Sequence, residues 1–283
     1  MRRWRSEVAR QAIADDETRP PSMMMWRRLL TVGIHRHLWI LSLCLVTLSG
    51  CTGVQRPKDP AHSATEHYTR ALQYLSIGAP EAAIKELQEA LKLDPTKAEY
   101  YHLLAFAYHY EGRYQFALAN YAKALELAPS YAEAHVHLAG LYLELARWDE
   151  ALAQGREALK ITAYQHPEIA YNTIGLAYMG KGDLISARRA FRDALAYHEH
   201  FPEAHRNLGT LYFQQGQIED AIREFREAVR LRPSYAEALH DLGVAYLERG
   251  SQAEAVAQFQ KVIQLDPESE LAEVAKWYLE ALP

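Results

Sequence analysis

The sequence predicts an all-α protein in which one helical hairpin is repeated six times to form a right-handed superhelical solenoid. Two observations lead to this prediction. Ala, Leu, Glu and Tyr dominate the 283 residues and β-branched residues are sparse after residue 63, which favours helix. Beyond residue 63 the chain also repeats itself about every 34 residues. Since one hairpin can bury only one of its faces, neighbouring hairpins must stack.

The composition excludes several classes of protein. Apolar residues make up 49% of the chain and charged residues 24%, with 14 Gly and 12 Pro, which excludes disordered, collagen-like and polytopic membrane proteins. The net charge of −5 argues against nucleic acid as a partner, because general nucleic-acid binding relies on a basic surface. Two cysteines cannot form a disulfide framework.

The first fifty residues differ in charge from the rest of the chain and are expected to be a signal peptide. They hold eight Arg and four acidic residues, and Arg28 and Arg36 precede the uncharged run Leu38–Leu48. As a helix this run would be about 17 Å long, well short of the roughly 30 Å hydrocarbon core of a bilayer. A basic region followed by a short apolar run is typical of a secretory leader. A start at Met23, Met24 or Met25 would give a leader of conventional length.

The residues that follow, Leu48-Ser49-Gly50-Cys51, resemble the bacterial lipobox. The resemblance implies that the Cys51 thiol is diacylglycerated and that the chain is cut before this residue. Two or three acyl chains, at about 0.8 kcal/mol per buried methylene, hold a protein on a bilayer. The alternative is an ordinary thiol after an ordinary signal peptide. Because residue 52 is Thr rather than Asp, the resemblance implies sorting to the outer membrane on its periplasmic face, although an extracellular orientation stays open.

The remainder of the chain divides into a tether, six repeats and a final helix. Residues 51–63 contain two prolines and several polar residues and are expected to form a flexible tether. Residues 270–283 form an amphipathic pattern and are expected to be a capping helix. The repeats span residues 64–97, 98–131, 132–167, 168–201, 202–235 and 236–269.

Four positions of the repeat carry the same kind of residue in every copy. Position eight is small: Ala71, Ala105, Ala139, Gly175, Gly209 and Gly243. Position eleven is always tyrosine: Tyr74, Tyr108, Tyr142, Tyr178, Tyr212 and Tyr246. Position fifteen is glycine except in the third copy: Gly78, Gly112, Ala146, Gly182, Gly216 and Gly250. Position twenty is always alanine: Ala83, Ala117, Ala151, Ala187, Ala221 and Ala255.

This pattern resembles the tetratricopeptide repeat, and each residue type has a physical role in a hairpin of helices A and B. Small residues at positions eight and twenty let the two helices approach closely. Tyrosine at position eleven is expected to fill the gap between repeats. Glycine at position fifteen ends helix A with a positive φ. Proline near the end of most repeats stops helix B.

No catalytic or metal-binding motif is present, so we expect a protein that is not an enzyme and has no cofactor, no metal and no small-molecule substrate. The sequence contains no His-Glu-x-x-His, no Cys-x-x-Cys, no phosphate-binding glycine loop and no nucleophile elbow. His102 and His109 are seven residues apart, which places them on one face of a helix about 10 Å from each other. This spacing favours a surface-lining role over metal binding.

The resemblance implies a concave groove lined mainly by helix A positions two, five, nine and twelve, with position thirteen near its rim. These residues are largely aromatic and aliphatic, which suits a helix or an extended peptide from a protein partner. The alternative for any one of them is packing between neighbouring A helices. The lysines and asparagines of the chaperone-type carboxylate clamp are absent. The candidate groove residues are Tyr68, His102, Phe106, His109, Tyr110, Val136, Asn172, Met179, Arg206, Phe213 and His240.

A lipobox, a tether, six repeats and a cap together are similar to the type IV pilus biogenesis lipoproteins, also called pilotins. This resemblance implies a lipid-anchored scaffold that assists assembly or outer-membrane targeting of a secretin, with a secretin subunit as the candidate partner. Two alternatives remain. One is a periplasmic adaptor for a protease or for the envelope-synthesis machinery, and the other is a cytosolic scaffold with a misassigned leader.

Overall fold

The computed structural model describes residues 60–282, and all of the regular structure in this range is helical. The predicted all-α class is confirmed, with thirteen helices over the described residues. None of these helices is long and apolar enough to cross a membrane. The predicted signal peptide, Cys51 and residues 52–59 of the tether lie outside the described residues.

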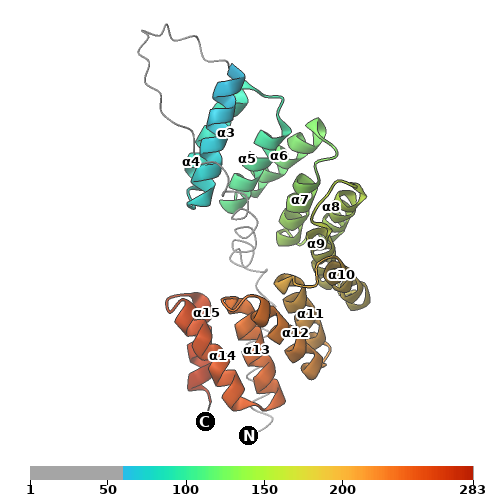
Figure 1. Cartoon of the computed structure of the whole chain (residues 1–283), viewed down its shortest axis with the longest axis vertical. Coiled ribbons are helices and arrows are strands. Elements are labelled where there is room, and N and C mark those ends of the chain that lie inside the picture. The colour runs from blue at the N-terminus through green and yellow to red at the C-terminus, as the bar shows by residue number, and fades with distance from the viewer. Residues whose placement is uncertain (1–59, 283) are drawn as a thin grey trace, which may run out of the picture. The chain divides into compact units, whose positions relative to one another are not determined.

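The described residues divide into two compact bodies, and the boundary along the chain lies between residues 144 and 145, inside the third repeat. In each body, helices that follow one another in sequence pack together, as the predicted stacking of hairpins requires (Figure 1). The N-terminal body contains α3 (Pro60–Ser76), α4 (Pro80–Leu93), α5 (Ala98–Tyr110), α6 (Tyr114–Leu127) and α7 (Ala132–Glu144). The C-terminal body contains α8 (Trp148–Lys160), α9 (Pro167–Gly180), α10 (Leu184–Tyr197), α11 (Pro202–Gln214), α12 (Ile218–Leu231), α13 (Ala236–Arg249), α14 (Gln252–Leu265) and α15 (Glu270–Glu280).

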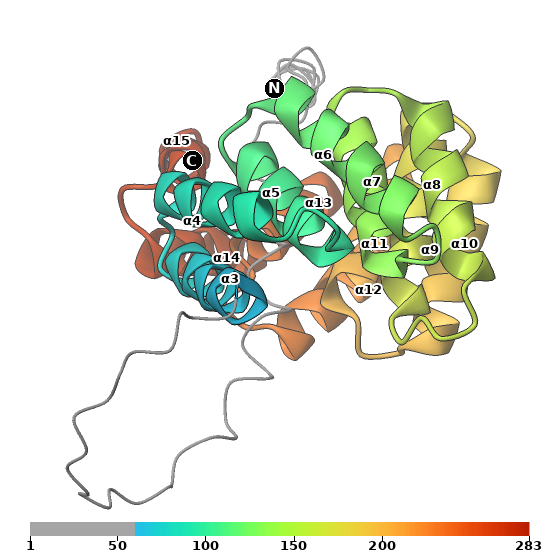
Figure 2. The ribbon, with the colours of Figure 1, turned by 90° about the horizontal axis from the view of Figure 1, so that it is seen from above.

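The A helices are the odd-numbered helices α3 to α13, and three pairs of successive A helices contact each other within the bodies. The pair α5 and α7 does so in the N-terminal body, and α9, α11 and α13 do so in the C-terminal body. In Figure 2, α8, α9 and α10 lie side by side, which agrees with the contacts that α9 makes with both of its neighbours. Within each body, these A helices therefore contact both a B helix and another A helix.

The turn between helices A and B has a positive φ at position fifteen of every repeat. The five glycines at this position have φ between 69° and 87°. Ala146 takes the same left-handed conformation, with φ of 53°, although a Cβ atom makes this conformation unfavourable. The predicted role of position fifteen is therefore confirmed, and the third repeat adopts the turn at a cost in strain.

Close packing of A on B depends on position eight. In the last three repeats this glycine lies under a phenylalanine at position 24, and a Cβ atom at Gly209 would lie 2.7 Å from the Phe225 ring. The Ala residues at position twenty are fully buried in all six repeats. In the first two repeats, alanine at position eight is matched by Leu87 or Tyr121 at position 24.

The tyrosine at position eleven links one repeat to the next, as predicted. In three repeats its hydroxyl accepts a hydrogen bond from position 25 of the preceding B helix. The donor–acceptor pairs are Gln88 and Tyr108 at 3.2 Å, Arg156 and Tyr178 at 2.7 Å, and Arg192 and Tyr212 at 3.0 Å. The stacking of hairpins is therefore fixed by polar contacts as well as by burial of apolar surface.

The two ends of the array differ in how well the sequence predicted them. Residues 60–63, expected in the tether, form the first turn of α3 instead. Proline is compatible with this turn because the first N–H groups of a helix have no partner within it. At the other end, α15 begins as predicted at Glu270, and the Ser269 hydroxyl accepts a hydrogen bond from the N–H of Ala272.

Candidate partner-binding surface

The seams between successive A helices are closed by polar pairs that follow one rule. Position five of one A helix contacts position six of the next, 35 residues later in the chain. Three pairs of this kind are present: His102 with His137, Asn172 with Asn207, and Arg206 with Asp241. Six of the predicted groove residues lie at position five, and for three of them, His102, Asn172 and Arg206, the structure shows the alternative of packing between neighbouring A helices.

The first seam, between α5 and α7, is built from histidines. His102 Nε2 lies 2.8 Å from His137 Nδ1, and the two rings stack with their centroids 4.9 Å apart. The hydroxyl of Tyr131 lies 3.0 Å from His102 Nδ1. Burial, together with the neighbouring His137, holds the pKa of His102 well below its usual value. Burial, together with His109, lowers the pKa of His137 to about 4.

The other predicted residues of the N-terminal body are buried or partly buried against neighbouring side chains. Phe106 and Val136 are buried, and the Phe106 ring lies 5.5 Å from that of His137. His109 Nε2 lies 3.1 Å from a carboxylate oxygen of Glu144, but neither His109 nitrogen has a hydrogen-bonding geometry with a partner. Tyr68 stacks on Tyr100, with centroids 5.0 Å apart. Tyr110 is partly buried at the end of α5.

The two seams of the C-terminal body use different chemistry. The side-chain amide of Asn207 donates a hydrogen bond of 2.9 Å to the side-chain oxygen of Asn172, and both residues are buried. Arg206 Nε donates to a carboxylate oxygen of Asp241 at 2.7 Å. Burial raises the pKa of Asp241, but the Arg206 guanidinium outweighs this effect, so that the pKa is lowered overall. His240 lies beside the same carboxylate, 3.3 Å from its other oxygen.

Position twelve of the same helices carries apolar side chains that are not used in the seams. Met179, Phe213 and Leu247 occupy this position on α9, α11 and α13, and each is partly buried against the hydrophobic core. These three side chains define an apolar strip, the name used below for this set. Since methionine and aromatic side chains adapt to varied apolar contacts, the apolar strip is the part of the predicted groove in this body that is best suited to a protein partner.

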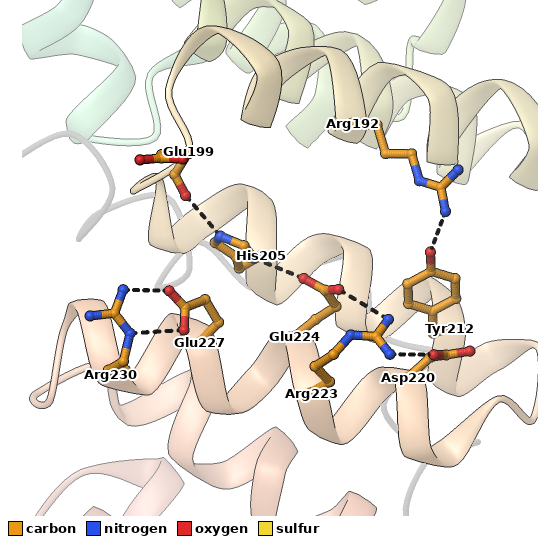
Figure 3. A network of polar contacts seen from close by, with 9 residues as sticks. All are labelled: Arg192, Glu199, His205, Tyr212, Asp220, Arg223, Glu224, Glu227 and Arg230. Carbon is orange, nitrogen blue, oxygen red and sulfur yellow. Dashed lines mark hydrogen bonds and ion pairs between the residues drawn. The ribbon is translucent and has the colours of Figure 1, made fainter.

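A further polar network ties helix A to helix B and was not predicted from the sequence. In the fifth repeat, His205 Nδ1 lies 2.8 Å from a carboxylate oxygen of Glu224, and Nε2 lies 3.0 Å from the carbonyl oxygen of Glu199 (Figure 3). Burial lowers the pKa of His205, but the hydrogen bond to Glu224 outweighs it and the pKa is raised overall. In the first repeat, His67 and Glu86 form the same contact at 2.7 Å. The signal available in the sequence was His at position four with Glu at position 23.

Several ionisable side chains of the described residues lie in pairs. Among residues 60–282, no group of three or more His, Cys, Asp or Glu side chains is arranged to hold a metal ion. Two of the three seam pairs, His102–His137 and Arg206–Asp241, are formed by ionisable groups, and these contacts join neighbouring A helices.

Three family descriptions match the chain, and all are of the same repeat. Two described as tetratricopeptide repeat match residues 108–163 and the overlapping ranges 172–222 and 206–270, and one described as TPR repeat matches residues 71–111. The chain belongs to the tetratricopeptide repeat family. No curated protein sequence matches it.

Solved structures with a similar fold include two pilus proteins. Pseudomonas aeruginosa PilF has a TM-score of 0.65 and 21% identity, over 79% of this chain and 100% of PilF. PilW, a widely conserved type IV pilus biogenesis factor, has a TM-score of 0.68 and 22% identity, over 75% of this chain and 98% of PilW. The Cut9–Hcn1 hetero-tetramer of the APC/C has a TM-score of 0.66 and 17% identity, but only 42% of that chain is covered. At these identities the similarity is one of fold.

Proposed function

We propose that this protein is a lipid-anchored scaffold that assists the assembly or outer-membrane targeting of a secretin in a type IV pilus or secretion system. The observation that carries the proposal is the end-to-end match to PilF and PilW, of which 100% and 98% are covered. Cut9–Hcn1 has a similar TM-score, but only 42% of that chain is matched.

The proposed anchor is Cys51, the last residue of the Leu48-Ser49-Gly50-Cys51 pattern. Acyl chains on this cysteine would hold the array at the periplasmic face of the outer membrane, where a secretin is assembled. Substitution of Cys51 by Ala should abolish metabolic labelling with palmitate and release the protein from the membrane fraction. Labelling that persists in the Cys51→Ala variant would contradict the anchor.

The proposed role in secretin assembly is tested by deletion of the gene. We expect the secretin to remain monomeric or to be lost from the outer membrane, and the wild-type gene to restore heat-resistant multimers. Undiminished multimers in the deletion strain would refute this role. A defect confined to proteolysis or to envelope synthesis would support the adaptor alternative instead.

The proposed contact surface for the partner is the apolar strip. Phe213→Gln keeps much of the side-chain volume and removes the apolar contact, so it should weaken recovery of the secretin from detergent extracts at least tenfold. The matched control is Ile185→Gln on α10, since Ile185 is also apolar and is 74% exposed. Equal loss in both variants would show that the apolar strip has no special part in binding.

A further inference from the structure

The three A-helix seams are equivalent in position but differ in how they respond to protons. The α9–α11 seam is closed by two carboxamides, which do not titrate. The α11–α13 seam is closed by a guanidinium and a carboxylate, and the pKa of Asp241 is lowered by this pairing. Among these pairs, only the α5–α7 seam is closed by two groups whose ordinary pKa lies near neutrality.

The geometry of the histidine pair allows only one proton between the two facing nitrogens. His102 Nε2 and His137 Nδ1 are 2.8 Å apart, so one of them carries hydrogen and the other must offer a lone pair. The second nitrogen of His102 is already engaged with the Tyr131 hydroxyl at 3.0 Å. If both rings were protonated, two N–H groups would face each other within a seam of stacked rings.

The surroundings offer little compensation for a second charge. His102 is buried, its ring lies 5.9 Å from that of Tyr121, and the Tyr121 hydroxyl has no hydrogen-bond partner. The buried carboxylate of Glu144 lies beside His109, at 3.1 Å. The titratable groups that face the pair are Tyr121 and Tyr131 beside His102, and His109 near His137. Beyond them, Tyr68, Glu99 and Glu133 interact with Tyr131, and Glu144 interacts with Tyr121.

We propose that the α5–α7 seam is an acid-opened latch: the His102–His137 contact holds the two A helices together at neutral pH, and the seam opens as protons bind both rings. This inference does not depend on the proposed function. In an opened seam, each histidine would titrate near its ordinary pKa of about 6.5. Below that pH, opening becomes about tenfold more favourable per pH unit for each histidine that gains a proton on opening.

The test is hydrogen–deuterium exchange on the purified full chain between pH 7.5 and 5.0, corrected for the intrinsic dependence of exchange on pH. We expect the protection of amides in α5 and α7 to fall about tenfold or more per pH unit below about 6.5. The α9–α11 seam is the internal control and should keep its protection. A parallel loss in all helices, or unchanged protection of α5 and α7, would overturn the proposal.

The chain also supplies a matched variant. His102→Asn combined with His137→Asn reproduces the Asn172–Asn207 pair, which keeps a hydrogen bond between positions five and six without a titratable group. The pH dependence of exchange in α5 and α7 should disappear in this double variant, and the same slope as in the wild type would refute the latch. If the double variant does not fold, NMR titration of the histidines in the wild-type protein provides the test. Both rings should titrate at a pH well below 6.5, together with chemical-shift changes of the amides in α7. Titration near pH 6.5 without such changes would overturn the proposal.

Discussion

Gly209 and Phe225 give the sharpest test of how the repeats pack. A Cβ atom at Gly209 would lie 2.7 Å from two atoms of the Phe225 ring and 3.2 Å from a third, whereas nonbonded carbon atoms pack at about 3.5–4.0 Å. Phe225 is 2% exposed and cannot swing into solvent. For Gly209→Ala, helix α11 or the ring must therefore shift by roughly 1 Å, and overpacking of this kind costs about 1–3 kcal/mol.

The gain from replacing glycine by alanine in a helix opposes this cost. It amounts to about 1 kcal/mol, so the net destabilisation by Gly209→Ala is about 1 kcal/mol and at most about 2 kcal/mol. Gly140 on α7 is the matched control, because a Cβ atom there would have no heavy atom within 4 Å outside its own helix. Gly140→Ala should therefore stabilise the protein by up to about 1 kcal/mol.

The assay is thermal unfolding followed by circular dichroism. We expect Gly209→Ala to lower Tm by roughly 2–4 °C and Gly140→Ala to raise it by a similar amount. Phe225→Leu should rescue Gly209→Ala in part, because the pair then resembles Ala71 and Leu87 of the first repeat, and the double-mutant cycle should show favourable coupling of about 0.5 kcal/mol or more. An increase in Tm for Gly209→Ala equal to that of Gly140→Ala would refute the packing argument.

Three further predictions concern strain, protonation and a buried ion pair. Ala146→Gly should stabilise the protein by up to about 1 kcal/mol in thermal unfolding, because it relieves the left-handed backbone at φ of 53°; destabilisation would contradict this reading. Since the pKa of His205 is raised in the folded state, protonation of His205 contributes fully to stability below about pH 6.5, and this contribution is lost as the pH rises through the folded-state pKa. His205→Gln should therefore flatten the pH dependence of Tm above pH 6.5. An unchanged profile would exclude His205 as the source of that dependence. Arg206→Met leaves the Asp241 carboxylate without its ion-pair partner and should lower the free energy of unfolding in urea by about 3 kcal/mol. Arg223→Met is the control, because this side chain is 62% exposed, and it should lower the same free energy by less than about 1 kcal/mol. Equal losses in the two variants would contradict the argument from burial.

Much of the fold could be predicted because its signals are local and repeated six times. A tyrosine at position eleven or a glycine at position fifteen says little in a single copy, but the recurrence fixes the length of the hairpin and the place of each turn. The strained Ala146 shows the strength of this effect, since it takes the same φ sign as the five glycines. The exception at the N-terminal end has the same origin, because residues 60–63 precede the first copy and carry no repeated signal.

The candidate surface was harder to predict because positions on one helix face can be used in two ways. The resemblance to the tetratricopeptide repeat placed His102, Asn172 and Arg206 in the groove, but it did not show that each would contact the next A helix, 35 residues away. A sequence read one repeat at a time does not reveal partners in the following repeat. Phe213 and Met179 carry the same kind of signal, and the tertiary structure leaves them outside the seams.

By itself, the sequence determined the helical hairpins, their number, their turns and the small residues between them, because local conformational preference and periodic burial are properties of the chain taken in order. Only the tertiary structure decided which inner-face side chains join the A helices and which remain for a partner. The reason is physical: these contacts depend on the distances between helices, which the order of residues in one repeat does not contain. The same distances decide which atom faces a buried group, such as the His102 nitrogen that faces His137.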